Sequence, residues 1–321
     1  MIKVQKLSKH FGKVKAVDEI SFEVKEHENL ILLGTSGCGK TTTLKMINRL
    51  IEPSAGNILI DGKNISEQSP EILRRGIGYV LQNNGLFPHY TVAENIAVVP
   101  QLLKWDKKRT EKRVDELLEK LHLTKDYLHV YPNELSGGQQ QRVGLARALV
   151  ADPAVLLMDE PFGALDNVTR SKIHAEFKAL DELKRKTIIM VTHDVQEAFE
   201  LGDHICLMDQ GKIVQDGTPA ELLNNPKNEF VKDFLKEQRL QLEFKTVRLY
   251  DIWKWLPKKH HETKSKVLSS NTDFWTGLEY FKFDASETIS INNKEDEEIR
   301  SATFEELMSA FYQYKKQQAH E

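Results

Sequence analysis

What is scarce in this chain of 321 residues excludes several classes of protein. It has two cysteines, Cys38 and Cys206, which is too few for a disulfide framework and is typical of a reducing compartment. No apolar run approaches the roughly 20 residues that a membrane-spanning helix needs, and the first residues do not resemble a signal peptide. An excess of one charge is also missing, since 45 basic and 48 acidic residues give a net charge of −3. We therefore expect a cytosolic protein without a nucleic-acid partner, whose role at any membrane depends on other subunits.

What the chain does contain is the phosphate-binding pattern G-x-x-x-x-G-K-[ST]. An apolar stretch at 29–33 predicts a buried strand before it, and the apolar spacing after Thr42 predicts a helix. In that context the backbone N–H groups of the loop turn toward a phosphate, Lys40 reaches the β- and γ-phosphates, and the Thr41 hydroxyl ligates Mg²⁺. The correct flanks disfavour the alternative of a chance glycine-rich turn. We assign ATP binding to Gly34, Thr35, Ser36, Gly37, Cys38, Gly39, Lys40, Thr41 and Thr42.

Two further strand ends carry polar side chains suited to the same chemistry. The apolar run 154–158 ends in Asp159 and Glu160, and the run 187–192 ends at His193. Ligands of open α/β sheets bind where strands end, so Asp159 is expected to hold Mg²⁺ and Glu160 to act as general base on water. His193 is expected to contact the γ-phosphate. The alternatives are solvated acids at a strand end and a structural histidine.

The segment Leu135-Ser136-Gly137-Gly138-Gln139, followed by a helical run to Leu149, resembles the signature motif of ATP-binding-cassette (ABC) ATPases. The resemblance covers roughly residues 1–240. It implies that Ser136, Gly137, Gly138 and Gln139 bind nucleotide, that Gln82 contributes to catalysis and to Mg²⁺ binding, and that Asp166 belongs to the D-loop. It also implies that Phe11 stacks on adenine, although a packed aromatic at a strand edge is the alternative for that residue.

The implied fold is α/β, with a P-loop NTPase-type core, an antiparallel β subdomain and an inserted α-helical subdomain at about 86–150. The ABC ATP-binding domain is expected at 1–240 and a small C-terminal accessory region at 241–321. Within the insertion, 107–123 is predicted to form a charged amphipathic helix with Val114, Leu117, Leu118 and Leu121 on one stripe.

The resemblance also implies partners. In the family, one P-loop and one signature per chain face the same nucleotide only across a head-to-tail homodimer, so two ATP molecules are expected between Lys40 of one chain and Ser136 of the other. A coupling helix of a transmembrane permease subunit is expected to dock near Gln82–Val92, unless Leu86 and Phe87 pack beneath the helical region. An extracytoplasmic substrate-binding protein would then act indirectly, and the chain would lie peripherally on the cytoplasmic face of a bacterial cell membrane.

The stretches 82–96 and 159–166 resemble importers of quaternary amines such as glycine betaine, choline and carnitine. An importer of another solute, such as an amino acid, is one alternative. A soluble ABC-type ATPase of ribosomes or chromosomes is another, but it is disfavoured because there is a single cassette and no long heptad segment between P-loop and signature. An unrelated P-loop kinase is disfavoured by the signature itself.

The C-terminal region 241–321, called the tail below, carries no phosphate motif. Relatives among quaternary-amine importers often have a pair of CBS modules here, but this tail is too short for two and neither is recognised. In 244–259 basic and aromatic residues alternate, which suits an anionic membrane surface, although a helix packed on its own domain is favoured. The acidic stretch 293–298 is expected to be solvated and 304–314 to form a final helix. We expect a small accessory domain that modulates or dimerises.

Overall fold

The computed structural model describes residues 2–82, 85–163, 167–258, 267–283, 288–293 and 298–318. Contacts along the chain divide it into two compact units, Met1–Thr218 and Pro219–Glu321. The segment between residue 219 and the predicted boundary at 240 therefore groups with the C-terminal unit.

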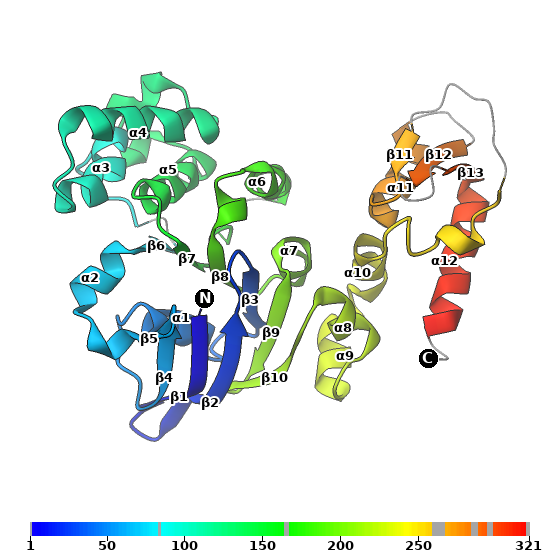
Figure 1. The fold of residues 1–321 in the computed structure, drawn as a ribbon, viewed down its shortest axis with the longest axis horizontal. Coiled ribbons are helices and arrows are strands. Elements are labelled where there is room, and N and C mark those ends of the chain that lie inside the picture. Colours follow the sequence, from blue (N-terminus) through cyan, green and yellow to red (C-terminus); the bar gives the residue numbers. More distant parts are fainter. Residues whose placement is uncertain are drawn as a thin grey trace. The chain divides into compact units, whose positions relative to one another are not determined.

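The centre of the N-terminal unit is a six-stranded sheet in the order β10-β9-β3-β8-β7-β6 (Figure 1). All neighbouring strands pair in parallel except β10, which is antiparallel to β9. The central strands β3, β7 and β8 are apolar and almost continuously buried, as expected of parallel strands covered on both faces. Their carboxyl ends meet at one edge of the sheet. The strands are β3 (Asn29–Gly34), β6 (Ile77–Val80), β7 (Val155–Asp159), β8 (Thr187–Thr192), β9 (His204–Asp209) and β10 (Lys212–Gly217).

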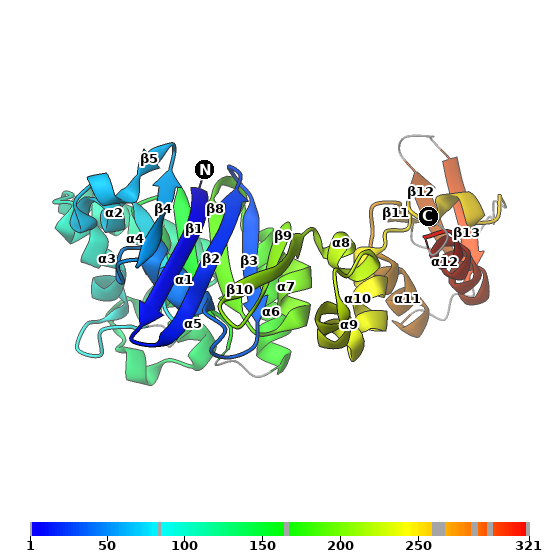
Figure 2. The same ribbon diagram turned by 90° about the horizontal axis from the view of Figure 1, so that it is seen from below.

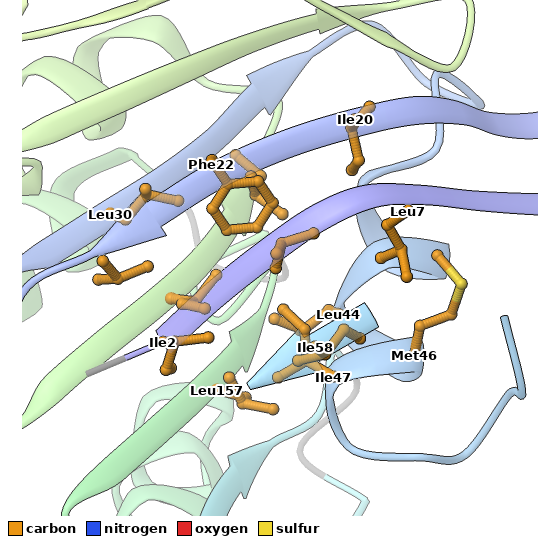
Figure 3. Packing of buried hydrophobic residues seen from close by; sticks show 14 of the residues in the cluster. Ile2, Leu7, Ile20, Phe22, Leu30, Leu44, Met46, Ile47, Ile58 and Leu157 are labelled. Atoms are coloured by element: carbon orange, nitrogen blue, oxygen red, sulfur yellow. The ribbon is translucent and has the colours of Figure 1, made fainter. Parts of the chain in front are cut away.

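A second, antiparallel sheet has the order β2-β1-β4-β5 and confirms the predicted β subdomain. Its strands are β1 (Ile2–Phe11), β2 (Val14–Val24), β4 (Ala55–Ile60) and β5 (Lys63–Asn64). Figure 3 shows how its side chains meet those of helix α1 (Lys40–Ile47) in one buried cluster, with Leu7 and Phe22 on the strands and Leu44 and Ile47 on the helix. This packing fixes the helix that follows the phosphate loop.

The predicted helical insertion is confirmed between β6 and β7. Helix α4 buries Val114, Leu117 and Leu118, and Leu121 directly after it is buried as well. The buried carboxylate of Glu182 accepts hydrogen bonds from Arg113 and Lys120 of α4, which fastens the insertion to the core. Within the described ranges, every helix is too short or too polar to traverse a lipid bilayer. The helices of this unit are α1, α2 (Pro70–Arg75), α3 (Val92–Leu102), α4 (Lys107–Lys120), α5 (Gly137–Leu149), α6 (Asn167–Ala179) and α7 (Val195–Leu201).

The C-terminal unit is a small α/β unit with its own sheet, in the order β11-β12-β13 (Figure 2). Strands β11 and β12 are parallel and are joined through helix α11, whereas β12 and β13 are antiparallel. The core gathers Trp253, Phe274, Ile289 and Phe311. The predicted final helix is confirmed and extends to Gln318. The elements are α8 (Pro219–Asn224), α9 (Glu229–Lys236), α10 (Arg239–Thr246), α11 (Phe274–Phe283), α12 (Phe304–Gln318), β11 (Val267–Ser269), β12 (Thr288–Asn293) and β13 (Glu298–Thr303).

The prediction of a helix over 244–259 is wrong. Helix α10 ends at Thr246. The Val247 N–H still donates to the Glu243 carbonyl, but Leu249 donates to the Thr272 carbonyl and Tyr250 to that of Ser270, so the helix does not continue. A short 3₁₀ turn follows at 253–255. Packing within its own unit is nevertheless confirmed, since the apolar side chains enter the core above and Lys254 and Lys258 stay exposed. Residues 294–297 of the acidic stretch lie outside the described residues.

Candidate functional site

The phosphate loop lies between the carboxyl end of β3 and the start of α1. Gly37 and Gly39 have φ of 80° and 108°, in the left-handed region that favours glycine. A Cβ at Gly39 would lie 2.4 Å from the Ala16 carbonyl oxygen, and one at Gly34 would lie 2.2 Å from that of Met208. Side chains are therefore excluded where the loop passes closest to its neighbours.

The start of α1 presents unpaired donors. Its N-cap residue is Gly39, which provides no side-chain hydrogen bond to the first helical N–H groups. Such groups, together with the helix dipole, form an anion site. Lys40 is buried, and its Nζ donates to the carbonyl oxygens of Gly34 and Thr35, each at 2.8 Å. The loop thus combines backbone donors and a cation, which is the donor set that a polyphosphate requires.

Thr41 and Asp159 form the next part of the site. The Thr41 hydroxyl donates to Asp159 Oδ1 at 2.7 Å, which joins the first turn of α1 to the end of β7. Asp159 is only 4% exposed, and burial raises the pKa of its carboxyl although the Thr41 hydrogen bond opposes this. A hydroxyl and a carboxylate side by side are the hard oxygen ligands that Mg²⁺ prefers.

Glu160, the residue after β7, is held by two side chains from other strand ends. Gln82 Nε2 donates to its Oε2 at 2.9 Å, and His193 Nδ1 lies 3.1 Å from its Oε1. Gln82 follows β6 and His193 follows β8, so the parallel order β8-β7-β6 brings the three together. The structure confirms that these predicted residues are neighbours.

The backbone of Glu160 is also constrained. Its φ is +45°, which is strained for a residue with a side chain, and its N–H donates to the Val191 carbonyl at 2.9 Å. The carboxylate is 17% exposed. Strain held by the sheet edge fixes where this carboxylate points.

The signature segment forms a second helix start. Ser136 is the N-cap of α5, and its contacts with Gln139 form a capping box in which the Ser136 N–H donates to Gln139 Oε1 at 2.8 Å. Gly137 and Gly138 are the first helical residues. Ser136 is exposed, so its hydroxyl and this helix start face solvent within one chain.

Phe11 and Asp166 complete the predicted set. Phe11 ends β1 with its ring 50% exposed and Lys9 Nζ lying 5.2 Å from the ring centroid. The exposure disfavours the alternative of a packed aromatic and leaves a ring face available for stacking. Asp166 lies outside the described residues.

A cavity of about 340 Å³ opens between the sheet and the helical insertion. Phe87 lines it and is 47% exposed, whereas Leu86 is half-buried, so Phe87 does not pack beneath the insertion. Arg147 lies over the Phe87 ring with its guanidinium carbon 5.7 Å from the centroid and donates to the Gly85 carbonyl at 2.8 Å. Arg74 and Arg75 also line the cavity, which makes it apolar with a basic rim.

Asn95 organises the loop beside this cavity and is a residue that the motif analysis missed. It is fully buried in α3, accepts a hydrogen bond from the Phe87 N–H, and donates to the carbonyls of Phe87, Tyr90 and Thr91. The available signal was an asparagine directly before the apolar run Ile96-Ala97-Val98-Val99. A buried amide in such a place needs several partners.

Known proteins resemble this chain over most of its length. A family profile described as "ABC transporter" matches residues 17–163. The glycine betaine uptake system ATP-binding protein YehX of Escherichia coli is 42% identical over 308 residues, which are 96% of this chain and 99% of YehX. The chain belongs to the ABC transporter family. The glycine betaine/carnitine/choline transport ATP-binding protein OpuCA of Bacillus subtilis is 54% identical over 241 residues. That alignment covers 75% of this chain but 63% of OpuCA, so the chain spans less than two thirds of this relative.

A solved structure of an ABC cassette supports the same assignment. The dimeric, post-hydrolysis structure of the ATP-binding cassette MJ0796 bound to ADP and Pi is 34% identical, with a TM-score of 0.61. It covers 68% of this chain and 98% of the cassette. The predicted fold class, a P-loop ABC ATPase core with a β subdomain and a helical insertion, is therefore confirmed.

Proposed function

We propose that this ABC protein is the ATP-binding and ATP-hydrolysing subunit of an importer, and that it drives uptake through separate transmembrane subunits. The proposal rests on the position of the Glu160 carboxylate, which contacts both Gln82 and His193. Glu160 directly follows Asp159, the residue that is hydrogen-bonded to Thr41. A general base, two polar groups to orient its target and a polyphosphate site thus share one edge of the sheet.

The site fits ATP and Mg²⁺. The uncapped start of α1, the loop glycines and Lys40 would hold the phosphates, Phe11 would stack on adenine, and Thr41, Asp159 and Gln82 would hold the metal. Bound Mg²⁺ supplies neutralisation of the charge on the phosphates. The Thr41–Asp159 hydrogen bond keeps two of these ligand groups together before any ion arrives.

The chain's own residues then account for hydrolysis. Glu160 accepts a proton from the attacking water, because its strained backbone and two side-chain partners fix the direction of its carboxylate. Gln82 and His193 orient that carboxylate, and His193, which is 56% exposed, also faces outward where the terminal phosphate would lie.

The working unit is proposed to be a head-to-tail homodimer. Ser136 offers an exposed hydroxyl, and Gly137 and Gly138 open α5 beside it, while Gln139 closes the capping box. A hydroxyl at a helix start is suited to a phosphate brought by a second chain. The MJ0796 cassette is dimeric in its post-hydrolysis structure, which supports this arrangement. Asp166 is assigned to the same dimer interface on the basis of its motif alone.

Transport requires a docking surface, and we assign it to the cavity beside Gln82–Val92. Exposed Phe87 offers an apolar contact, and three arginines on the rim suit a partner helix that carries a carboxylate. The partner is a permease subunit, served outside the membrane by a substrate-binding protein, so the chain lies peripherally at the cytoplasmic face. The names of OpuCA and YehX support glycine betaine or another quaternary amine as solute; an amino acid is the alternative.

The test has two parts. The purified chain should bind and hydrolyse ATP in the presence of Mg²⁺, and Lys40→Ala should lose nucleotide affinity. Co-expressed with a candidate permease, it should co-purify with that membrane protein and support uptake of glycine betaine in vesicles loaded with ATP. Hydrolysis without any permease association would favour a soluble ABC ATPase.

A further inference from the structure

Two helices of the N-terminal unit begin directly after segments assigned to the nucleotide site. Helix α6 begins at Asn167, and α7 begins at Val195, two residues after His193. Charged contacts fasten one helix to the other. Arg170 Nη1 lies 3.1 Å from Asp194 Oδ2, and His174 Nε2 lies 3.2 Å from Glu197 Oε1.

His174 is a titratable group that the hydrolytic site does not use. It is 5% exposed, and Phe162 packs against its ring edge-on at 4.7 Å between centroids. Its second nitrogen, Nδ1, lies 3.6 Å from Glu200 Oε2, so both nitrogens face carboxylates of α7. Burial by itself would lower the pKa of His174, but the hydrogen bonds to Glu197 and Glu200 outweigh it and raise the pKa from 6.5 to about 8.

The two carboxylates differ in their access to water. Glu197 is buried, at 3% exposure, whereas Glu200 lines a cavity of about 320 Å³ whose other ionisable lining residues are His27, Lys178, Lys184 and Asp203. A protonated imidazole donates from both nitrogens, and a neutral one donates from one only. Loss of the proton would therefore weaken at least one of the two contacts, and a buried carboxylate that loses its cation is strongly unfavourable.

We propose that His174, in its protonated form, is a positioning residue for hydrolysis: by bridging Glu197 and Glu200 it fixes α7 and thereby the distance between His193 and Glu160. The inference rests on the proposed ATPase function. Because the phosphate loop and α1 make no part of this bridge, nucleotide binding should not depend on it, whereas turnover should.

The experiment compares turnover and nucleotide affinity between pH 7 and 9. In the wild-type protein kcat should fall above pH 8 and reach about one tenth by pH 9, as the imidazole loses its proton. His174→Gln should lower kcat about tenfold at pH 7, keep the affinity for ATP, and show no fall between pH 7 and 9. Glu200→Gln removes one of the two carboxylates, so it should lower kcat at pH 7 by less than His174→Gln does and move the fall to lower pH.

Glu176→Gln is the matched control, because it breaks another ion pair of α6, with Arg142 of α5 at 2.6 Å, without touching α7. It should keep the wild-type fall above pH 8. The inference, but not the proposed ATPase function, would be overturned if kcat of His174→Gln depended on pH as in the wild-type protein. The same holds if kcat of Glu200→Gln fell at the wild-type pH. Equal loss of ATP affinity and turnover in His174→Gln would also overturn it, since that marks a purely structural role. A wild-type protein that hydrolyses no ATP would instead remove the proposed function.

Discussion

The Gln82 amide donates a 2.9 Å hydrogen bond to the carboxylate of Glu160, and the two residues come from the ends of adjacent parallel strands. Gln82 also begins the segment that leads to the Phe87 cavity. One side chain therefore contacts the proposed base and lies at the start of the proposed permease-docking loop. A shift of the docking loop can therefore move the Glu160 carboxylate directly, through its hydrogen bond with Gln82.

Replacing Glu160 by Gln should stall turnover and preserve ATP binding. The amide keeps the shape and the contacts with Gln82 and His193 but cannot accept a proton, so kcat should fall on the order of 10²–10⁴-fold. Turnover is read from phosphate release and binding from a fluorescent ATP analogue, and size-exclusion chromatography with ATP should show the trapped dimer. Glu176→Gln, the same change outside the site, serves as control. Normal cycling by Glu160→Gln would contradict the assigned base.

Adding a single methyl group at Gly39 should destabilise the phosphate loop. Alanine there combines a φ of +108° with a Cβ 2.4 Å from the Ala16 carbonyl oxygen, so stability should fall by about 1–3 kcal/mol and ATP affinity with it. Gly62 is the matched control, because its φ is +77° but a Cβ would meet nothing within 4 Å. Gly62→Ala should show the smaller loss of stability and unchanged affinity. Thermal unfolding with and without ATP distinguishes the two variants. Equal losses of stability and of ATP affinity in both would contradict the close approach of the phosphate loop to Ala16.

The buried amide of Asn95 should couple hydrolysis to transport. Asn95→Ala removes the side-chain partner of the Phe87 N–H and of the Tyr90 carbonyl, whereas the carbonyls of Phe87 and Thr91 keep their backbone hydrogen bonds. The loss should cost about 1–3 kcal/mol and loosen the loop that presents Phe87. Basal ATPase activity of the isolated chain should persist, while uptake per ATP in the assembled importer should fall. Asn57→Ala, on an exposed strand position, is the control. Uptake unaffected by Asn95→Ala would remove the loop from the docking surface.

The sequence predicted those site residues whose position depends only on the residues next to them in the chain. The phosphate loop, Asp159, Glu160 and His193 could be placed because each lies at the end of an apolar strand, and parallel strands bring their ends to one edge. The contacts of His174 with Glu197 and of Asn95 with its loop could not, because they depend on how helix faces meet after packing. In the tail, Leu249 and Tyr250 have apolar and aromatic neighbours at helical spacing, yet tertiary hydrogen bonds to 270–272 prevent the helix.

Truncation should separate the two compact units. A chain that ends at Thr218 keeps both sheets and the complete site of the N-terminal unit, so we expect it to fold and to hydrolyse ATP. A chain that ends at 240 retains α8 and α9 without the unit in which they are grouped, and should expose Leu222, Val231 and Leu235. It should therefore aggregate more readily than the shorter chain. Light scattering and ATPase activity check both. If the accessory unit modulates transport, the assembled importer with the 218-residue chain should show altered uptake.

The stability of the N-terminal unit should depend on pH through His174. Its folded-state pKa of about 8 lies above the ordinary value of 6.5, so protonation favours the folded state. The contribution, up to about 2 kcal/mol, is fully present below pH 6.5 and is lost as pH rises through 8. Urea unfolding of the 218-residue chain at pH 6, 7, 8 and 9 measures it, with His174→Gln as reference. The difference between the two proteins should shrink with rising pH. A difference that stays constant from pH 6 to 9 would show that the imidazole carries no extra proton in the folded state, and the bridge between α6 and α7 would then be neutral.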